Sequence, residues 1–348
     1  MRVLLDLHHH ALAESMLLLF EDRFGWECYF PAGREWFDAG LWQFGRDHLG
    51  DALCNQFLVG IWAEGLTVPD PRHPGRTHKG VTYAEAQGAD WDLVVSSLPD
   101  NDPGYSRFAR SHGAKFAIEV GNANQWSSFE LADFLLVSTT LPGIGPEHIG
   151  KRIEFQGIPG VMLHQEFDAE HIFYKGEPQV GSTVATFMQC FPASPAYPRW
   201  DTVAREAPEF DWHVYGSTCG GSDEYSVGNI DWVPDIADAM RDARVGWHDK
   251  AGDGFGHVIH NWFAVGRPVV GRRAPYANAI AGALWDEGKT AFDTDRLGLH
   301  ETIALLRRLR DDDEWYARLC EQARWRFEEV VDFDAEAETV RRELEAVL

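Results

Sequence analysis

Residues 249–270 constrain the fold more than any other part of the chain. They read DKAGDGFGHVIHNWFAVGRPVV, so a polar turn rich in glycine runs directly into an apolar helical pattern. Gly266 ends that pattern, and residues 267–270 begin a short apolar run that indicates a buried strand. A glycine turn that opens a helix exposes several backbone N–H groups beside the positive end of the helix dipole. The segment therefore predicts an α/β unit that can bind a phosphate or diphosphate.

The order and spacing of this segment resemble the donor-site signature of GT-B glycosyltransferases of the retaining, nucleotide-sugar type. In that signature an acidic residue precedes Gly-Phe-Gly, a second acidic residue follows, and Ala-x-Gly-x-Pro-Val-Val closes the run. The matching positions are Asp253, Gly254, Phe255, Gly256, Ala264, Gly266, Pro268, Val269 and Val270. The chain departs from the signature at Asn261, where the family usually has the second acid, and at His257 and His260.

The length of the chain, 348 residues, is enough for two ordinary α/β domains, each with its own core. No apolar run approaches the ~20 residues that a membrane helix needs, and the first predicted strand begins at Arg2. We therefore expect no membrane span, no signal peptide and a cytoplasmic location. The net charge of −24, without any Lys/Arg-rich stretch, disfavours duplex DNA as the main partner.

The five cysteines are scattered singly along the chain, and none forms a CxxC pair. They are Cys28, Cys54, Cys190, Cys219 and Cys320. This distribution predicts reduced thiols, with neither a zinc site nor a disulfide.

The chain reads as two successive α/β halves. Strand, turn, helix and strand follow one another within residues 3–30, and the alternation restarts after a break near residues 175–178. With the resemblance, the pattern predicts two doubly wound, Rossmann-like domains that face a cleft. Residues 1–177 would bind the acceptor and residues 178–330 the nucleotide sugar. Residues 331–348 would form a final helix, which in this family commonly crosses back to the N-terminal domain.

Other segments of the second half fall where the resemblance predicts the rest of a donor site. The run 212–216 looks like the strand that ends beside the nucleotide, and 230–235 looks like the loop whose backbone reads the base. The Lys-Gly element that the family uses for the diphosphate is absent. Arg199 is the cation left in that region, and the alternative is a solvated arginine at a helix start. The donor-binding candidates are Arg199, Gly216, Val233, Pro234, Lys250, Gly254, Phe255, Gly256, His257 and Asn261.

Lys250 lies three residues before Asp253, in the same turn. A cation beside the diphosphate would offset the charge of the leaving group, a role that metals play elsewhere. The alternative is an exposed loop lysine.

Two Asp-x-Asp strings, at 293–295 and 332–334, imitate the metal-binding motif of other glycosyltransferases, but we interpret them as surface or capping residues. The sequence therefore predicts no metal and no cofactor other than the donor substrate, such as a UDP- or GDP-sugar.

Asp253 is a catalytic candidate with two interpretations. By the resemblance, its carboxylate would accept hydrogen bonds from hydroxyl groups of the donor sugar. The alternative is a helix N-cap, a position that aspartate favours. Asn261, eight residues further on, is expected to face the same way along the helix and to contact the ribose, which the family's glutamate would bind.

The N-terminal half contributes candidates at the ends of predicted strands, which in open α/β sheets border the ligand crevice. His8, His9 and His10 follow the first strand, and three consecutive residues cannot all bind one metal ion from an ordinary turn. We assign His9 and Asp100 as catalytic candidates, and His8, His10 and Asn122 as acceptor-binding candidates. The alternatives are solvated loop histidines and, for Asp100, a helix cap.

The predicted function is transfer of a sugar from a nucleotide diphosphate to an acceptor hydroxyl, with retention of configuration. Residues 6–33 are also similar to glycosyltransferase-like proteins of tailed bacteriophages, which would place the protein in the host cytoplasm. The acceptor would then be a glycan, a protein side chain or a modified base in phage DNA. The net negative charge of the chain makes DNA the least favoured of the three. Two alternatives stay open: a sugar-nucleotide-binding protein without turnover, and a GT-B sugar-nucleotide epimerase.

Overall fold

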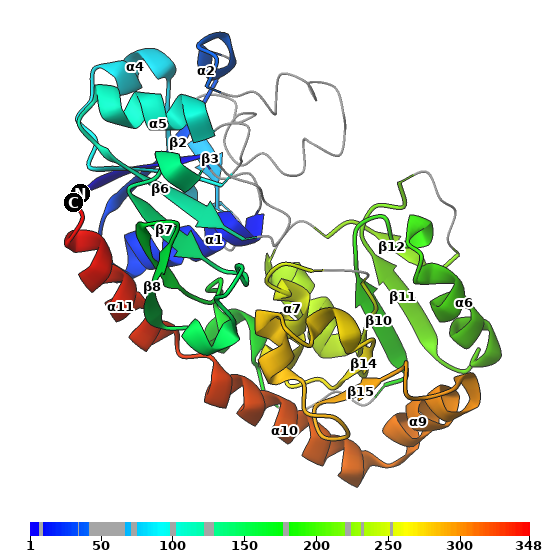
Figure 1. The fold of residues 1–348 in the computed structure, drawn as a ribbon. Coiled ribbons are helices and arrows are strands. Elements are labelled where there is room, and N and C mark those ends of the chain that lie inside the picture. The colour runs from blue at the N-terminus through cyan, green and yellow to red at the C-terminus, as the bar shows by residue number, and fades with distance from the viewer. Residues whose placement is uncertain are drawn as a thin grey trace. The chain divides into compact units, whose positions relative to one another are not determined.

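The computed structural model divides into two compact units (Figure 1). Unit 1 comprises Met1–Phe167 together with Asp332–Leu348, and unit 2 comprises Asp168–Val331. The structure describes residues 1–6, 10–33, 35–41, 67–70, 75–97, 102–121, 129–176, 181–219, 224–230, 233–250 and 253–348. The division between the units precedes the predicted domain boundary after residue 177, and the C-terminal segment belongs to unit 1.

Unit 1 is built on a nine-stranded sheet in the order β3-β4-β2-β1-β5-β6-β7-β9-β8. Neighbouring strands pair in parallel, except for the antiparallel edge pairs β3–β4 and β8–β9. The strands are β1 (Arg2–Asp6), β2 (Glu27–Pro31), β3 (Thr67–Pro69), β4 (Thr77–Val81), β5 (Leu93–Ser96), β6 (Lys115–Val120), β7 (Phe134–Val137), β8 (Lys151–Phe155) and β9 (Ile158–Met162). The central strands consist almost wholly of buried residues, as expected for a parallel sheet that is covered on both faces.

The helices of unit 1 surround this sheet. Those that the structure describes are α1 (His10–Leu17), η1 (Leu18–Arg23), α2 (Glu35–Asp38), α4 (Tyr83–Gln87), α5 (Asp102–Ser111), η3 (Phe129–Leu131), η4 (Pro146–His148) and α11 (Phe333–Glu345). Val3 and Leu93 from the sheet share one fully buried core with Met16 of α1 and Val340 of α11. The C-terminal helix is therefore part of the core of unit 1.

A buried carboxylate fixes α11 in that position. Glu336 on α11 accepts hydrogen bonds from the backbone N–H of His164, at 2.7 Å, and from the Nδ1 atom of the same histidine, at 2.6 Å. Both residues are nearly inaccessible to solvent. Since a buried carboxylate without partners is costly, this pair specifies where the helix docks.

Unit 2 is built on a six-stranded sheet in the order β12-β11-β10-β13-β14-β15, and all neighbouring strands pair in parallel. Its strands are β10 (Thr183–Phe187), β11 (Asp211–Tyr215), β12 (Ser226–Gly228), β13 (Val245–His248), β14 (Val269–Gly271) and β15 (Ala291–Asp293). Its described helices are η5 (Ala169–Phe173), η6 (Phe191–Ala193), α6 (Tyr197–Glu206), α7 (Val233–Asp242), α8 (His257–Ala264), η7 (Ala274–Tyr276), η8 (Ile280–Leu284), α9 (Leu299–Asp311) and α10 (Asp313–Val330).

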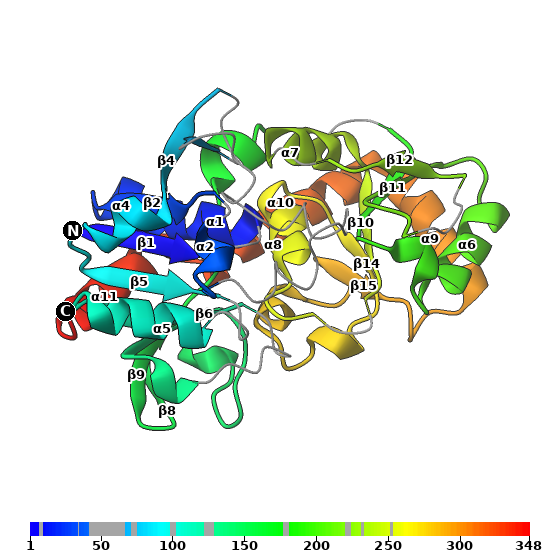
Figure 2. The ribbon, with the colours of Figure 1, turned by 90° about the horizontal axis from the view of Figure 1, so that it is seen from above.

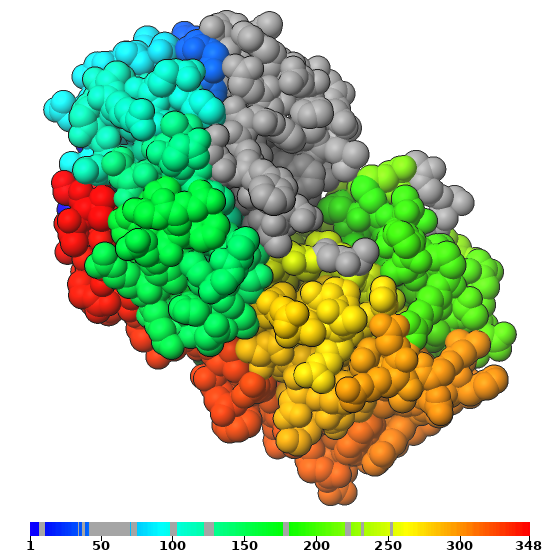
Figure 3. Space-filling model, viewed as in Figure 1, coloured from blue at the N-terminus to red at the C-terminus, as the bar shows by residue number. Residues whose placement is uncertain are grey.

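Helices cover both faces of the sheet of unit 2. Val184 of β10 and Trp247 of β13 pack with Trp200 of α6 in one buried cluster. On the other face, the ring of Phe187 contacts Trp262 of α8 with 5.5 Å between ring centroids. The sheet accordingly lies between α8 on one side and α6 with α9 on the other (Figure 2). Helices α9 and α10 form part of the surface of unit 2, where they appear in orange and orange-red (Figure 3).

The prediction of two doubly wound, Rossmann-like domains is confirmed. Part of the segment 230–235, expected as a loop, is helical, because Val233 already begins α7 and Pro234 fits the first turn of a helix. Among the residues that the structure describes, no helix has the length and apolar character needed to cross a membrane.

A buried histidine links three elements at one edge of unit 1. His78 on β4 contacts Asp70 through Nε2 at 2.8 Å and Glu21 of η1 through Nδ1 at 3.0 Å. Asp70 is fully buried, and Arg76 also lies 3.5 Å from it. Burial alone would lower the pKa of His78, but its hydrogen bonds to Asp70 and Glu21 outweigh that effect and raise the pKa above the ordinary value.

We expect this cluster to make stability depend on pH. Because the pKa of His78 is raised in the folded state, its contribution is complete below the unfolded-state pKa of about 6.5 and is lost as pH rises through the folded-state value. His78→Gln should therefore lower the free energy of unfolding at pH 6, and the difference from the wild type should narrow towards pH 9. Urea denaturation at both pH values measures this. A difference that is constant with pH would contradict the charged-histidine interpretation.

Candidate functional site

The candidate site lies at the carboxyl ends of the strands of unit 2, where the glycine turn joins β13 to α8. Gly256 is the N-cap residue of α8 and has φ of +82°, in the left-handed region that favours glycine. A Cβ atom at this position would lie 2.5 Å from the Cβ of Ala281. The sequence therefore needs glycine here for both its conformation and its space. Gly252 lies outside the described residues.

This turn directs the start of α8 towards the carboxyl edge of the sheet. The first backbone hydrogen bond of the helix runs from the Ile259 N–H to the Gly256 carbonyl, at 3.0 Å. The N–H groups of a first helical turn have no acceptor within the helix, and they lie at the positive end of its dipole. The first turn of α8, which begins at His257, thus has the arrangement that binds phosphate at other helix N-termini.

Asp253 precedes this turn, and four donors surround its carboxylate. They are the Lys250 Nζ at 3.1 Å, the Gly254 N–H at 3.1 Å, the His248 Nε2 at 3.5 Å and the Tyr276 hydroxyl at 3.5 Å. Since Gly256 is the N-cap and Asp253 bonds to the adjacent Gly254, the interpretation of Asp253 as the cap of α8 is wrong. Asp253 also lies before the helix, and does not share a helical face with Asn261.

The surroundings of Asp253 keep it ionised. Burial alone would raise the pKa of its carboxyl, but the hydrogen bond from His248 and the charge of Lys250 hold the pKa well below the ordinary value. Burial and the adjacent Asp253 charge raise the pKa of Tyr276, so that its hydroxyl keeps its proton and can donate. The site therefore contains a fixed negative charge of the kind that accepts hydrogen bonds from sugar hydroxyls.

The inner side of α8 is aromatic and closely packed. Phe255, which is 3% exposed, stacks on His260 with 4.0 Å between ring centroids. Asn261, one residue further on, is 4% exposed, and its Oδ1 has no hydrogen-bond partner in the structure. A buried amide oxygen without a partner is costly in a native protein. The Oδ1 atom of Asn261 is therefore an unused acceptor in unit 2, whereas His257 lies at the partly exposed first position of the helix.

Arginines and carboxylates form a chain along the same edge of the sheet. Arg199, in the first turn of α6, donates to Asp295 at 2.8 Å. Arg272, which follows β14, donates to the other oxygen of Asp295 at 3.0 Å and lies 3.9 Å from Asp249. The two guanidinium groups are thus held about one carboxylate, and both remain more than a third exposed.

Asp249, which follows β13, is fully buried, and both of its carboxylate oxygens are without a hydrogen bond in the structure. Burial raises the pKa of this carboxyl, and the charges of Arg272 and Arg199 only partly oppose that effect. Arg272, Asp295 and Asp249 were not among the predicted site residues. The sequence pattern that could have identified them is their position, because each lies directly or closely after a short apolar strand of the second half.

The remaining donor candidates lie at the ends of β11 and at the start of α7. Gly216 follows β11 with φ of +133°, and a Cβ there would lie 2.5 Å from the carbonyl oxygen of Met188. Val233 and Pro234 begin α7, so they lie in a helical first turn instead of the predicted loop. Residues 231 and 232 lie outside the described part of the chain.

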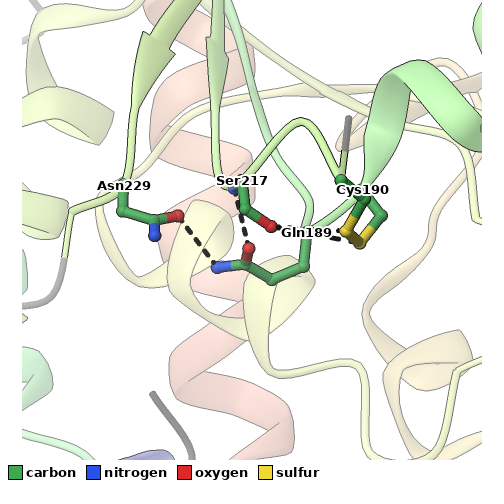
Figure 4. Close-up of a disulfide and its surroundings, with 5 residues drawn as sticks. Gln189, Cys190, Ser217 and Asn229 are labelled. Carbon is green, nitrogen blue, oxygen red and sulfur yellow. Dashed lines mark hydrogen bonds between the residues drawn. A yellow bond between two sulfur atoms is a disulfide. The ribbon is translucent and has the colours of Figure 1, made fainter. Parts of the chain in front are cut away.

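The prediction that all cysteines are reduced is wrong for one pair. Cys190 and Cys219 form a disulfide with a Cα–Cα distance of 5.0 Å (Figure 4), within the usual range for such a bond. Cys28 and Cys320 are free and buried, and Cys54 lies outside the described residues. The two bonded residues are 29 positions apart, so no local spacing pattern in the sequence predicts that they pair.

The candidates of the N-terminal half cannot be placed. His8, His9, Asp100 and Asn122 lie outside the described residues, and His10 is described only as the first backbone position of α1. Their proposed roles stay predictions.

No protein-family model and no curated protein matches the chain. Solved structures match it over its full length. The match to Anabaena HepE in complex with UDP and glucose covers 99% of this chain and 99% of HepE, with a TM-score of 0.64 and 12% sequence identity. HepE in complex with UDP-glucose matches with a TM-score of 0.63 and 13% sequence identity. The match to sucrose-phosphate synthase from Thermosynechococcus elongatus covers 100% of this chain and 99% of the synthase, with a TM-score of 0.61 and 11% sequence identity. The fold is that of GT-B glycosyltransferases.

The geometry at Gly256 predicts the effect of a single methyl group. Gly256→Ala should lower the free energy of unfolding by roughly 2–6 kcal/mol, because a left-handed alanine and an overpacked contact each cost about 1–3 kcal/mol. The matched control is Gly88→Ala, where φ is −95° and a Cβ meets nothing closer than 3.7 Å. Chemical denaturation of both variants measures the effect. Equal stability of the two would contradict the described turn.

Proposed function

We propose that the protein transfers a sugar from a nucleoside-diphosphate sugar, with UDP as the favoured nucleotide, to an acceptor hydroxyl. The observation that carries the proposal is the ionised Asp253 carboxylate beside the glycine turn at the start of α8. The GT-B fold supports it, since HepE is known in complex with UDP-glucose.

Each part of the donor has a counterpart in this site. The N-terminus of α8 and the Lys250 ammonium group suit the diphosphate, whose charge they would stabilise as it departs. Asp253 suits the hydroxyl groups of the sugar. The Oδ1 atom of Asn261, which has no partner in the structure, suits a ribose hydroxyl.

The proposal extends to features that rest on the resemblance. Transfer would proceed with retention of configuration and without a metal ion. It would take place in the cytoplasm, which for a phage protein is the cytoplasm of the host cell. His9 and Asp100 would act on the reacting groups, while His8, His10 and Asn122 would contact the acceptor. The acceptor class stays open between a glycan, a protein side chain and a modified DNA base.

A second candidate function is binding of a sugar nucleotide without turnover. The replacement of the family's second acid by Asn261 favours it, because an amide offers the ribose weaker, uncharged hydrogen bonds. A protein that binds UDP-sugars tightly but releases no UDP with any acceptor would have this function.

Calorimetry with UDP, GDP, dTDP and uridine tests the proposal directly. A nucleotide that binds the folded protein only should stabilise it by about 2.7 kcal/mol at 100 times its Kd. Uridine lacks the diphosphate and should bind much more weakly than UDP. If no nucleoside diphosphate binds at millimolar concentration, the proposed function is wrong.

Asp253→Asn should separate catalysis from stability. The substitution removes a charged acceptor worth about 1.5–3 kcal/mol, so kcat/KM should fall roughly 10- to 100-fold. The protein should stay folded, because asparagine keeps the shape of aspartate and one acceptor oxygen, although loss of a charge whose pKa is depressed in the folded state should lower the melting temperature. The matched control is Asp286→Asn, which breaks the similar pair with Lys289 at 2.9 Å. Unchanged kinetics in Asp253→Asn would remove Asp253 from the site.

Activity should persist in excess EDTA, because the helix dipole and Lys250 supply the positive charge that a metal provides elsewhere. Lys250→Ala should then lower kcat/KM about tenfold or more, whereas Lys289→Ala, which removes a lysine from an equivalent pair, should not. Loss of turnover in EDTA that Mg²⁺ or Mn²⁺ restores would show that the site needs a metal.

A further inference from the structure

A disulfide joins the loops that follow two adjacent strands of unit 2. Cys190 follows β10 and Cys219 follows β11, and these strands pair in parallel at the centre of the sheet. The Cys190 N–H also donates to the Ser217 carbonyl at 2.8 Å. The link therefore lies at the carboxyl edge, near Gly216 and in the region where the family's Lys-Gly element is absent.

Hydrogen bonds extend this connection to a third strand. The Ser217 N–H donates to the Gln189 Oε1 at 2.8 Å, and the Gln189 Nε2 donates to the Asn229 Oδ1 at 3.4 Å (Figure 4). The Gly216 N–H donates to the Gly228 carbonyl at 2.9 Å. The ends of β10, β11 and β12 are thus joined by one covalent bond and a short chain of hydrogen bonds.

The backbone at both cysteines is unusual. Cys190 has φ of +58° and Cys219 has φ of +50°, in the left-handed region that costs a non-glycine residue free energy. The surrounding structure must hold such residues in place. Without the covalent bond, both loops gain access to ordinary backbone conformations.

Of the cysteines that the structure describes, this pair is the one that a soluble thiol can reach. Cys219 is exposed, whereas Cys28 and Cys320 are buried. Burial also raises the pKa of both buried thiols, which makes them poor nucleophiles. In a reducing compartment, disulfides that form are usually transient and often sense the redox state.

We propose that the Cys190–Cys219 disulfide is a redox-sensitive brace that holds the loops of the nucleotide site in their binding conformation. The inference rests on the proposed function. With the brace intact, Gly216 and Gln189 are preorganised, and the nucleotide does not have to order them. With the brace open, binding must supply that ordering, and affinity falls.

The opening step is thiol–disulfide exchange with a dithiol reductant. One thiolate of the reductant attacks the Cys219 sulfur, the bond between the cysteines breaks, and the Cys190 thiolate takes up a proton. The second thiol of the reductant then attacks the mixed disulfide and releases Cys219 as a thiol. Two electrons pass from the dithiol, which becomes a disulfide, to the protein.

The test compares UDP binding in the oxidised and reduced protein. Calorimetry gives Kd before and after treatment with dithiothreitol, and thiol titration of the denatured protein confirms that the oxidised form has two fewer thiols. Reduction should raise Kd about tenfold or more, and reoxidation should restore it. Cys190→Ser and Cys219→Ser should bind as weakly as the reduced protein and should not respond to dithiothreitol. Cys320→Ala, which changes a buried free cysteine, should keep the full response.

The outcomes separate the two proposals. UDP binding with the same Kd in both redox states would overturn the brace and leave the proposed function in place. A response to dithiothreitol that persists in Cys190→Ser would also overturn the brace. No UDP binding in either state would overturn the proposed function, and the inference with it.

Discussion

The left-handed turn at Gly256 is the constraint on which the candidate site depends. It allows the chain to leave β13, reverse within a few residues and start α8 at the carboxyl edge of the sheet. The position of Asp253 before the turn and of Asn261 within the helix both follow from it. Since a side chain at Gly256 would meet Ala281, the packing of η8 against α8 also requires glycine. One residue therefore couples the core of unit 2 to the groups proposed to bind the donor.

The charges at this edge are paired in a way that prepares them for a ligand. Lys250 is held by Asp253, and Arg199 and Arg272 are both held by Asp295. The two pairs with Asp295 are exposed and contribute little stability, about 0–1 kcal/mol each, so an incoming diphosphate can compete for Arg199 and Arg272 at small cost. The carboxylates meanwhile restrict the long side chains, which lowers the entropy lost when a ligand orders them.

Local signals predicted the parts of this site that depend on consecutive residues. The turn, α8 and β14 follow from the run between Asp253 and Val270. The errors concern residues whose roles depend on distant partners. The disulfide of Cys190 with Cys219 and the sharing of Asp295 by two arginines arise only when separate strands end side by side. The alternative interpretation of Asp253 as a helix cap rested on the frequency of aspartate at such positions, but the conformation of Gly256 places the helix start three residues later.

The chain departs from the GT-B donor signature in two places, at His257, His260 and Asn261 on α8 and in the loop after β10. The loop after β10 has neutral Gln189 and a disulfide where the family has a cationic element, while the available cations follow β13, β14 or begin α6. A covalent link and a cation have different effects. The link reduces the conformational freedom of the loop, whereas a cation would attract the diphosphate. In the proposed donor site, the attraction for the diphosphate would come from the N-terminus of α8, from Lys250 after β13, and from Arg199 and Arg272, which share Asp295. The loop after β10 would contribute rigidity through its disulfide, and the cations would be supplied by neighbouring elements.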